Sequence, residues 1–272
     1  MTITDATKAF DASERAMWAG RAQVYAGSFA PLCAHTVEAL LDAAGVGEGS
    51  YVLDAGTGTG AAALAAQRRG ARVRAVDADA GMVAAARGRG VGAEIAVLPE
   101  LPFPDGGFDA VVGNFVLNHV GRPRTALAEL RRVLRPGGRL AVTVWRGRRG
   151  AGQELLGRAC EAAGAVPPAG LPRLDPVEDF ARTAEGLAGL LSEAGLAGTA
   201  AVEVEWDHRA GVEEWWSAAA GGVATVGLVV TSQEPETAAR IRREYERLGT
   251  DFLGADGRLV LPHAALLAHG TV

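Results

Sequence analysis

The residues best suited to chemistry form a short glycine-rich segment that begins with an acid. Residues 54–60 read Asp-Ala-Gly-Thr-Gly-Thr-Gly, which places glycine at Gly56, Gly58 and Gly60. Glycines permit tight turns and let a backbone approach a ligand closely. The N-terminus of a helix after such a loop attracts negative charge. The segment therefore predicts a ligand-binding loop between a strand and a helix.

A second acid, Asp77, ends the next expected strand and follows Gly60 by 17 residues. A carboxylate in that position can accept both hydroxyl groups of a ribose, so the pair of features predicts a nucleoside site. The glycines with Ala61 also match the relaxed dinucleotide fingerprint, which keeps a nicotinamide cofactor as an alternative. Asp54 favours another ligand, because its carboxylate would repel a pyrophosphate but suits the ammonium group of an amino acid.

Strands and helices alternate around this loop. The patterns predict helices over most of residues 5–45, then over 61–69, 81–88 and 124–134, with strands at 51–53, 73–76, 93–97, 108–113 and 140–145. This alternation predicts βαβ units around a parallel sheet. The loop at 54–60 then lies at the carboxyl end of the first strand.

The pattern is less regular after residue 146. We expect helices at 153–163, 187–194 and 235–248, a strand at 202–206, a mixed segment at 212–230, and a last strand or loop that begins at 258–261. The whole chain, 1–272, is expected to form one domain. Its parts are an N-terminal helical cap (1–45), a ligand-binding core (46–146) and a last part (147–272) that adds core strands and a substrate cap.

Two more segments narrow the class of protein. Residues 101–109 read Leu-Pro-Phe-Pro-Asp-Gly-Gly-Phe-Asp before the fourth strand, and residues 132–138 read Arg-Val-Leu-Arg-Pro-Gly-Gly before the fifth. With the loop and Asp77, they make residues 51–145 resemble the class I S-adenosylmethionine-dependent methyltransferases, in the type 11-like branch that modifies small molecules. The resemblance implies a Rossmann-like sheet of seven mostly parallel strands, helices on both faces and a helical cap.

The resemblance also implies S-adenosyl-L-methionine as cofactor and assigns roles to single residues. Glycines of the loop would surround its methionine part, Asp54 would lie near its amino group and Asp77 would bind its ribose. The implied cofactor-binding residues are Asp54, Gly56, Thr57, Gly58, Gly60, Asp77, Ala78, Met82, Val97, Leu98 and Asn114. Met82, Val97 and Leu98 are also explained as core residues, and Asn114 as a capping residue.

One histidine and several aromatic residues are candidates for binding or activating the molecule that receives the methyl group. His119 follows the fourth strand and is the candidate general base, with a structural role as the alternative. The other four histidines have no sequence neighbours that single them out. Aromatic residues are scarce, and five of them are candidate walls of the substrate pocket, with packing as the alternative: Trp18, Tyr25, Trp145, Trp215 and Trp216.

Composition excludes several classes of function. The net charge of −5 argues against nucleic acid as a partner, and the fourth strand lacks the tetrad of amino-methylating nucleic-acid enzymes. No window has the apolar length of a transmembrane helix, and Met1 to Phe10 have no apolar stretch of a secretory signal. We therefore expect a cytoplasmic protein without a bound metal, a monomer or homodimer. The excess of arginine over lysine is typical of a GC-rich bacterial genome.

The sequence leaves several functions open. The first is methylation of a small molecule, which we expect to be a bacterial secondary metabolite. A second is a non-methylating reaction, such as a cyclisation, in the same cofactor pocket. A third is a catalytically silent binding partner with the same fold, although a degenerate glycine loop would be expected there. A nicotinamide oxidoreductase is the fourth.

Overall fold

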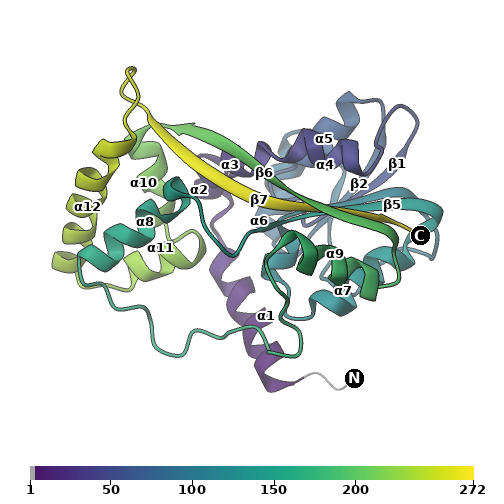
Figure 1. The fold of residues 1–272 in the computed structure, drawn as a ribbon, viewed down its shortest axis with the longest axis horizontal. Helices are drawn as coiled ribbons and strands as arrows, with labels where there is room; N and C mark the ends of the chain where they lie inside the picture. The colour runs from purple at the N-terminus through teal and green to yellow at the C-terminus, as the bar shows by residue number, and fades with distance from the viewer. Residues whose placement is uncertain (1–3) are drawn as a thin grey trace.

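One mixed sheet organises the chain, of which the computed structural model describes residues 4–272 (Figure 1). Residues 1–3, the start of the expected N-terminal cap, lie outside the described residues. The sheet has seven strands in the order β3-β2-β1-β4-β5-β7-β6. The strands are β1 (Tyr51–Ala55), β2 (Arg72–Asp77), β3 (Ala93–Ile95), β4 (Phe108–Asn114), β5 (Leu134–Trp145), β6 (Ala197–Ala210) and β7 (Leu259–Thr271). All neighbouring pairs from β3 to β5 are parallel, whereas β7 is antiparallel to both β5 and β6. The predicted Rossmann-like, mostly parallel sheet is confirmed.

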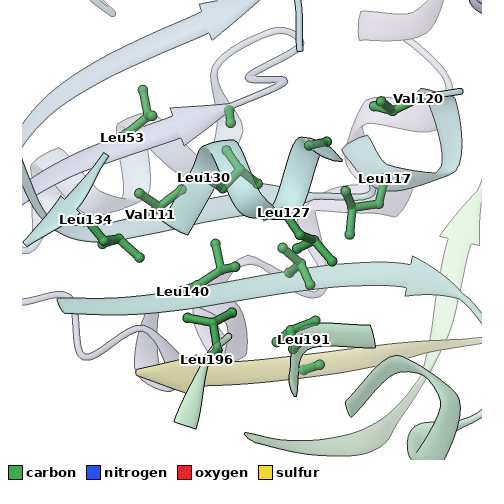
Figure 2. Packing of buried hydrophobic residues seen from close by; sticks show 14 of the residues in the cluster. Leu53, Val111, Leu117, Val120, Leu127, Leu130, Leu134, Leu140, Leu191 and Leu196 are labelled. Carbon is green, nitrogen blue, oxygen red and sulfur yellow. The ribbon is translucent and has the colours of Figure 1, made fainter. Parts of the chain in front are cut away.

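The central strands are apolar on both faces because helices cover both. In β1, Val52 packs into one hydrophobic cluster and Leu53 into another on the opposite side of the sheet. Figure 2 shows the second cluster, in which Leu53 and Val111 lie with Leu127 and Leu130 of a covering helix. Successive residues of a strand point to opposite faces, so continuous apolar runs mark strands buried on both sides.

Five helices cover the sheet. Those that pack against one face are α4 (Val37–Ala43), α5 (Ala61–Arg68) and α6 (Ala80–Gly88), and those on the other face are α7 (Pro123–Arg132) and α9 (Ala184–Glu193). Figure 1 shows α4 and α5 opposite α7 and α9 across the sheet. Local signals set several helix starts. The side chain of Asp79 accepts a hydrogen bond from the backbone N–H of Met82, 2.9 Å away, and Pro123 begins α7.

A second group of helices surrounds the far ends of β6 and β7. It contains α8 (Ala151–Ala162), α10 (Val212–Ala220), α11 (Ala224–Thr231) and α12 (Pro235–Gly249), which lie together on one side of Figure 1. A separate hydrophobic cluster holds them together, with Trp215 and Tyr245 fully buried in it. A 3₁₀ turn (Thr250–Phe252) connects α12 to β7.

The N-terminal region forms short helices instead of one long one. They are α1 (Asp5–Trp18), α2 (Ala22–Ala26) and α3 (Phe29–Ala34) before α4. Gly20, with a φ of 73°, separates the first two. This left-handed backbone conformation is one that glycine adopts readily. The breaks let the segment change direction, so that α3 contributes Leu32 to the cluster of the second helical group.

Several expected boundaries were wrong, among them the starts of β5 and β6, which lie at Leu134 and Ala197 instead of 140 and 202. The helix expected over 124–134 ends at Arg132, because Leu134 already pairs with Phe108 in the sheet. The next pair of β4 with β5 is Ala110 with Arg139, so the Pro-Gly-Gly turn forms an irregularity inside β5. The segment expected to begin a last strand or loop at 258–261 is a strand, β7, which starts at Leu259 and continues to Thr271 because β5 and β6 provide partners on both sides.

Two further observations concern the chain as a whole. Among residues 4–272, no helix combines the length and the apolar character that crossing a membrane requires. Cys33 and Cys160 are free thiols. Burial raises the pKa of Cys33 to about 12, so this thiol stays protonated at neutral pH.

Candidate functional site

A cavity of about 810 Å³ opens at the carboxyl ends of the parallel strands. Residues that follow β1, β2, β4 and β5 line it, together with residues of α1 to α3, α8, α10 and α11. Strand β1 lies between β2 and β4, so the chain order reverses here, and ligands of open α/β sheets bind at such reversals. The cavity therefore lies where the fold favours a ligand.

The glycine loop crosses the end of β2. The backbone N–H groups of Gly56 and Thr57 both donate to the carbonyl oxygen of Val76, at 2.9 Å each. Gly56 has a φ of 72°, and a Cβ atom there would lie 2.4 Å from a methyl carbon of Val116. Position 56 therefore admits only glycine without rearrangement. The loop brings Gly56 and Gly58 to the cavity surface.

Asp77 joins this loop to the cavity. One of its carboxylate oxygens accepts from the N–H of Gly58 at 2.8 Å, and the other accepts from the N–H of Asp79 at 3.0 Å. Burial raises the pKa of Asp77 above its ordinary value, while these two hydrogen bonds oppose the rise. The side chain lines the cavity, and each oxygen keeps a lone pair for a ligand hydroxyl.

Asp54 lies behind the loop, buried under it. Its Oδ2 accepts from the Thr57 hydroxyl at 2.6 Å and from the N–H of Ala63 at 3.0 Å, while Oδ1 has no hydrogen-bond partner among the described residues. Burial raises the pKa of Asp54 to about 6. A buried carboxylate oxygen without a donor is costly, and none of the described residues supplies one.

Asn114 uses its side chain for structure. Its Oδ1 accepts from the hydroxyls of Thr36 and Thr143, at 2.7 Å each, and its Nδ2 donates to the carbonyl of Cys33 at 2.9 Å. These bonds tie the N-terminal helices to the ends of β4 and β5. The residue lines the cavity, and its side chain is fully engaged.

His119 is held by the N-terminal helix, an arrangement that sequence analysis missed. Its Nδ1 lies 2.8 Å from the Glu14 carboxylate, and the indole N–H of Trp18 lies 3.4 Å from the same nitrogen. The shorter contact to a carboxylate indicates that Nδ1 carries a proton, which leaves Nε2 as the basic nitrogen. Glu14 and Trp18 are four residues apart and so share a helix face, a signal that the sequence contained.

Aromatic side chains form another part of the cavity wall. Trp145 stacks on Phe115 with ring centres 4.1 Å apart, and Trp215 lies 5.0 Å from Phe29. All four line the cavity. Phe115 was not among the predicted residues. Its φ of 61° is unusual for a residue with a side chain, and such strain is frequent at functional sites.

The cavity brings together most of the predicted site residues. Those that line it are Trp18, Tyr25, Gly56, Gly58, Asp77, Ala78, Met82, Val97, Leu98, Asn114, His119, Trp145 and Trp215. Four others lie elsewhere. Asp54 and Thr57 support the loop from beneath, and Gly60 is the N-cap residue that precedes α5. Trp216 points away from the cavity and packs against Tyr245 and Arg242, because neighbouring residues of a helix face different directions.

Comparison with known proteins gives the class. Residues 53–142 match the family model described as "Methyltransferase domain". The demethylmenaquinone methyltransferase of Mycolicibacterium paratuberculosis is 41% identical over 105 residues, which are 39% of this chain and 46% of that relative. The corresponding enzyme of Mycobacterium bovis is 40% identical over 97 residues, which are 36% of this chain and 42% of the relative. The matches thus span less than half the length of these relatives.

Solved structures resemble the fold over a longer part of the chain. The YcgJ protein of Bacillus subtilis has a TM-score of 0.55 and 21% identity, with 87% of this chain and 97% of that chain covered. Phosphoethanolamine N-methyltransferase 2 of Haemonchus contortus, solved with phosphomonomethylethanolamine and S-adenosylhomocysteine, has a TM-score of 0.52 and 16% identity. The two alignments cover 87% of this chain, and the second covers 52% of that enzyme.

The family model, the motifs and the fold agree. Residues 53–142 form a methyltransferase domain, and their motifs resemble those of the class I S-adenosylmethionine-dependent methyltransferases.

Proposed function

We propose that this protein transfers a methyl group from S-adenosyl-L-methionine to a small organic acceptor. The observation that carries the proposal is one cavity that contains Gly56, Gly58 and Asp77 beside a separate aromatic wall. The first part has the chemistry of a nucleoside and amino-acid site. The second part leaves room for another molecule, since pockets of this volume commonly hold small ligands.

The residues fit the cofactor. A Cβ atom at position 56 would clash with Val116, so glycine lets the loop pack on Val116 while its backbone lines the cavity. Asp77 would accept hydrogen bonds from the ribose hydroxyls. Asp54, with Oδ1 unpartnered, would attract the amino group of the methionine part, directly or through water. Ala78 and Met82 would pack on the adenine, with Val97 and Leu98 at its edge.

The chemistry that the cofactor supplies when bound is a methyl group on positively charged sulfur, open to an in-line displacement. The protein residues then orient the acceptor and exclude water. We propose that His119 removes a proton from the acceptor through Nε2, since Nδ1 faces Glu14. Glu14 would hold the imidazole in this tautomer and orient it.

We propose that the second part of the cavity binds a small-molecule acceptor. The demethylmenaquinone methyltransferases that resemble the core of this chain act on a small molecule by their name. We propose further that this acceptor is a secondary metabolite. That the protein is bacterial and cytoplasmic remains a prediction from the sequence. Among the described residues, no group of His, Cys, Asp and Glu side chains could hold a metal ion.

Titration calorimetry with S-adenosylhomocysteine tests the cofactor part of the proposal. We expect micromolar binding to the unchanged protein and a loss of more than about 100-fold in Asp77→Ala, because two hydroxyl groups lose their acceptor. Asp251→Ala is the matched control, since Asp251 is exposed and outside the cavity. Binding of NADH in place of S-adenosylhomocysteine would contradict the proposal.

A turnover experiment tests the reaction itself. The protein is incubated with S-adenosylmethionine and a panel of small aromatic and aliphatic acceptors, and S-adenosylhomocysteine is quantified. Formation of S-adenosylhomocysteine with a product heavier by one methylene unit supports methyl transfer. Conversion of an acceptor without that mass change would instead support a non-methylating reaction. Near-normal turnover in both His119→Ala and His119→Gln would contradict the role of His119 as base.

A further inference from the structure

The part of the cavity that the cofactor site leaves free has its own chemical character. Resting on the proposed function, we propose that the acceptor is a flat aromatic anion, such as an aromatic carboxylate, and that Arg149 binds its negative group. The inference comes from the aromatic wall, from the distribution of charge around the cavity and from the partners of three arginines.

The wall of this part includes a flat aromatic surface. Trp145 stacks on the buried Phe115 at 4.1 Å with the ring planes 26° apart, and Trp145 itself is half-buried and lines the cavity. Leu32 and Leu156 add aliphatic surface to the same cavity. Flat apolar surfaces gain most from contact with another flat ring, through stacking and through removal of apolar area from water.

Charges around the cavity are divided between two groups of elements. Acids come from α1 and from the end of β2, namely Asp11, Glu14, Asp77 and Asp79, with Arg15 as the basic residue of α1. The charged residues that the segments after β5 and before α9 contribute to the lining are all arginines: Arg146, Arg149 and Arg182. The acidic group suits a positively charged cofactor, and the basic group suits a negatively charged acceptor.

Two of these three arginines already have partners. Arg146 lies 2.5 Å from Glu203 and 3.2 Å from Glu205. Arg182 lies 3.1 Å from Asp179 and stacks over the ring of Phe180. Both guanidinium groups therefore have their charge compensated by the protein.

Arg149 differs from these two. Within residues 4–272 it has neither an ion pair nor a side-chain hydrogen bond. It lines the cavity from an exposed position. Its five donors are available to a ligand, and a guanidinium matches a carboxylate with two parallel hydrogen bonds.

The loop that carries Arg149 is fixed on both sides. The N–H of Gly147 donates to the carbonyl of Arg182 at 2.9 Å, and the Nε of Arg146 donates to the carbonyl of Arg148 at 2.6 Å. At the other side, a Cβ on Gly150 would lie 2.6 Å from the carbonyl oxygen of Pro262, so the loop lies directly against β7. These contacts hold the backbone of Arg149 at the edge of the cavity.

Binding of two matched probes tests the inference. 2-Naphthoate is the aromatic anion, and 2-naphthamide is a neutral molecule of nearly the same shape. Calorimetry is carried out with each probe, in the presence and absence of S-adenosylhomocysteine. We expect naphthoate to bind more tightly than naphthamide. Arg149→Met should weaken naphthoate binding roughly five- to tenfold and leave naphthamide binding unchanged, because only the charge contact is lost.

Arg148→Met is the matched control. Arg148 is the exposed neighbour in the same loop and does not line the cavity. We expect its probe affinities and thermal midpoint to equal those of the unchanged protein. Three results would each overturn the inference: no naphthoate binding, equal affinity for the two probes, or equal losses in both variants. A titration with S-adenosylhomocysteine alone tests the proposed function separately. Whether or not S-adenosylhomocysteine binds, the comparison of naphthoate with naphthamide still tests the role of Arg149.

Discussion

The two parts of the cavity differ in how the chain builds them. The cofactor part comes from consecutive strand ends between residues 54 and 119, and backbone groups of Gly56 and Gly58 do much of the positioning. The acceptor part comes from side chains far apart in the sequence, such as Phe29, Trp145 and Trp215. The difference indicates that one part depends on local conformation and the other on packing between distant helices and strands.

The largest expected effect is a loss of ligand affinity in the cofactor part of the cavity. Gly56→Ala should weaken S-adenosylhomocysteine binding by more than about 100-fold, because the added Cβ meets Val116 at 2.4 Å and the backbone has a φ of 72°. Calorimetry measures the affinity. Gly49→Ala is the control, since it has a φ of 77° but no atom within 4 Å of the added Cβ. If both variants lose affinity equally, the loss comes from backbone strain at a positive φ and not from the contact of position 56 with Val116.

The stability of the region around the acceptor part, which packs distant segments together, should fall in acid. Burial lowers the pKa of His208 and of His263 to about 4, below the ordinary 6.5. Between pH 6.5 and 4 the unfolded chain therefore binds protons that the folded chain does not, so stability falls as the pH falls. The loss is roughly 3 kcal/mol for one such histidine and levels off below pH 4. Denaturant unfolding at several pH values measures it.

His263→Asn provides the comparison for this prediction. The Nδ1 of His263 lies 2.8 Å from the carbonyl of Leu261, and the amide of asparagine can replace that donor without titrating. We expect the variant to lose less stability between pH 6.5 and 4 than the unchanged protein. An unchanged slope would show that His263 does not contribute to the acid sensitivity.

The cofactor part should also depend on pH, with a smaller effect. Since the pKa of Asp54 is raised to about 6, its carboxyl group becomes neutral as the pH falls below 6. A neutral carboxyl attracts the amino group of the ligand less, so affinity for S-adenosylhomocysteine should fall by up to about tenfold per pH unit below 6. Asp54→Asn should bind more weakly at pH 7 and show a flatter profile. A steep profile that persists in the variant would assign the dependence to another group.

The smallest expected effect concerns the contact between the N-terminal helix and His119. Glu14→Gln removes the negative partner at 2.8 Å, so the imidazole should shift partly to the tautomer with the proton on Nε2. Nitrogen NMR of the histidine side chain measures the tautomer. We expect turnover to fall by less than about tenfold, with a changed pH profile. Asp11→Asn is the control, since Asp11 accepts from the backbone of Gly121 and not from His119.

Much of the fold followed from patterns in the sequence. The apolar runs of β1 and β4 and the glycine loop predicted the parallel core, and each of those elements lies within a few residues of its expected position. The long β7 was not predictable from its own residues, because its length depends on pairing with both β5 and β6. Non-local pairing of this kind leaves little trace in a short window of sequence.

Within the candidate site, the same distinction holds. Asp77 was predictable because its place at the end of β2 is a local property. The contact of Glu14 with His119 joins residues 105 apart in the sequence. Trp215 and Trp216 are neighbours with the same side chain, yet only Trp215 lines the cavity. The direction in which a helix packs decides between them, and no local pattern states that direction.

The sequence by itself determined the parallel core of the sheet, the glycine loop and the kind of ligand that the loop suits, because the backbone conformation of glycine and the end of a strand are local properties. Only the tertiary structure placed His35, His208 and His263 in one cluster with Trp206. It likewise placed Arg149, which has no ion pair among residues 4–272, in the lining of the same cavity as Trp145 and Phe115. Burial, charge compensation and the shape of the acceptor part depend on which distant segments meet, and packing of the whole chain decides that.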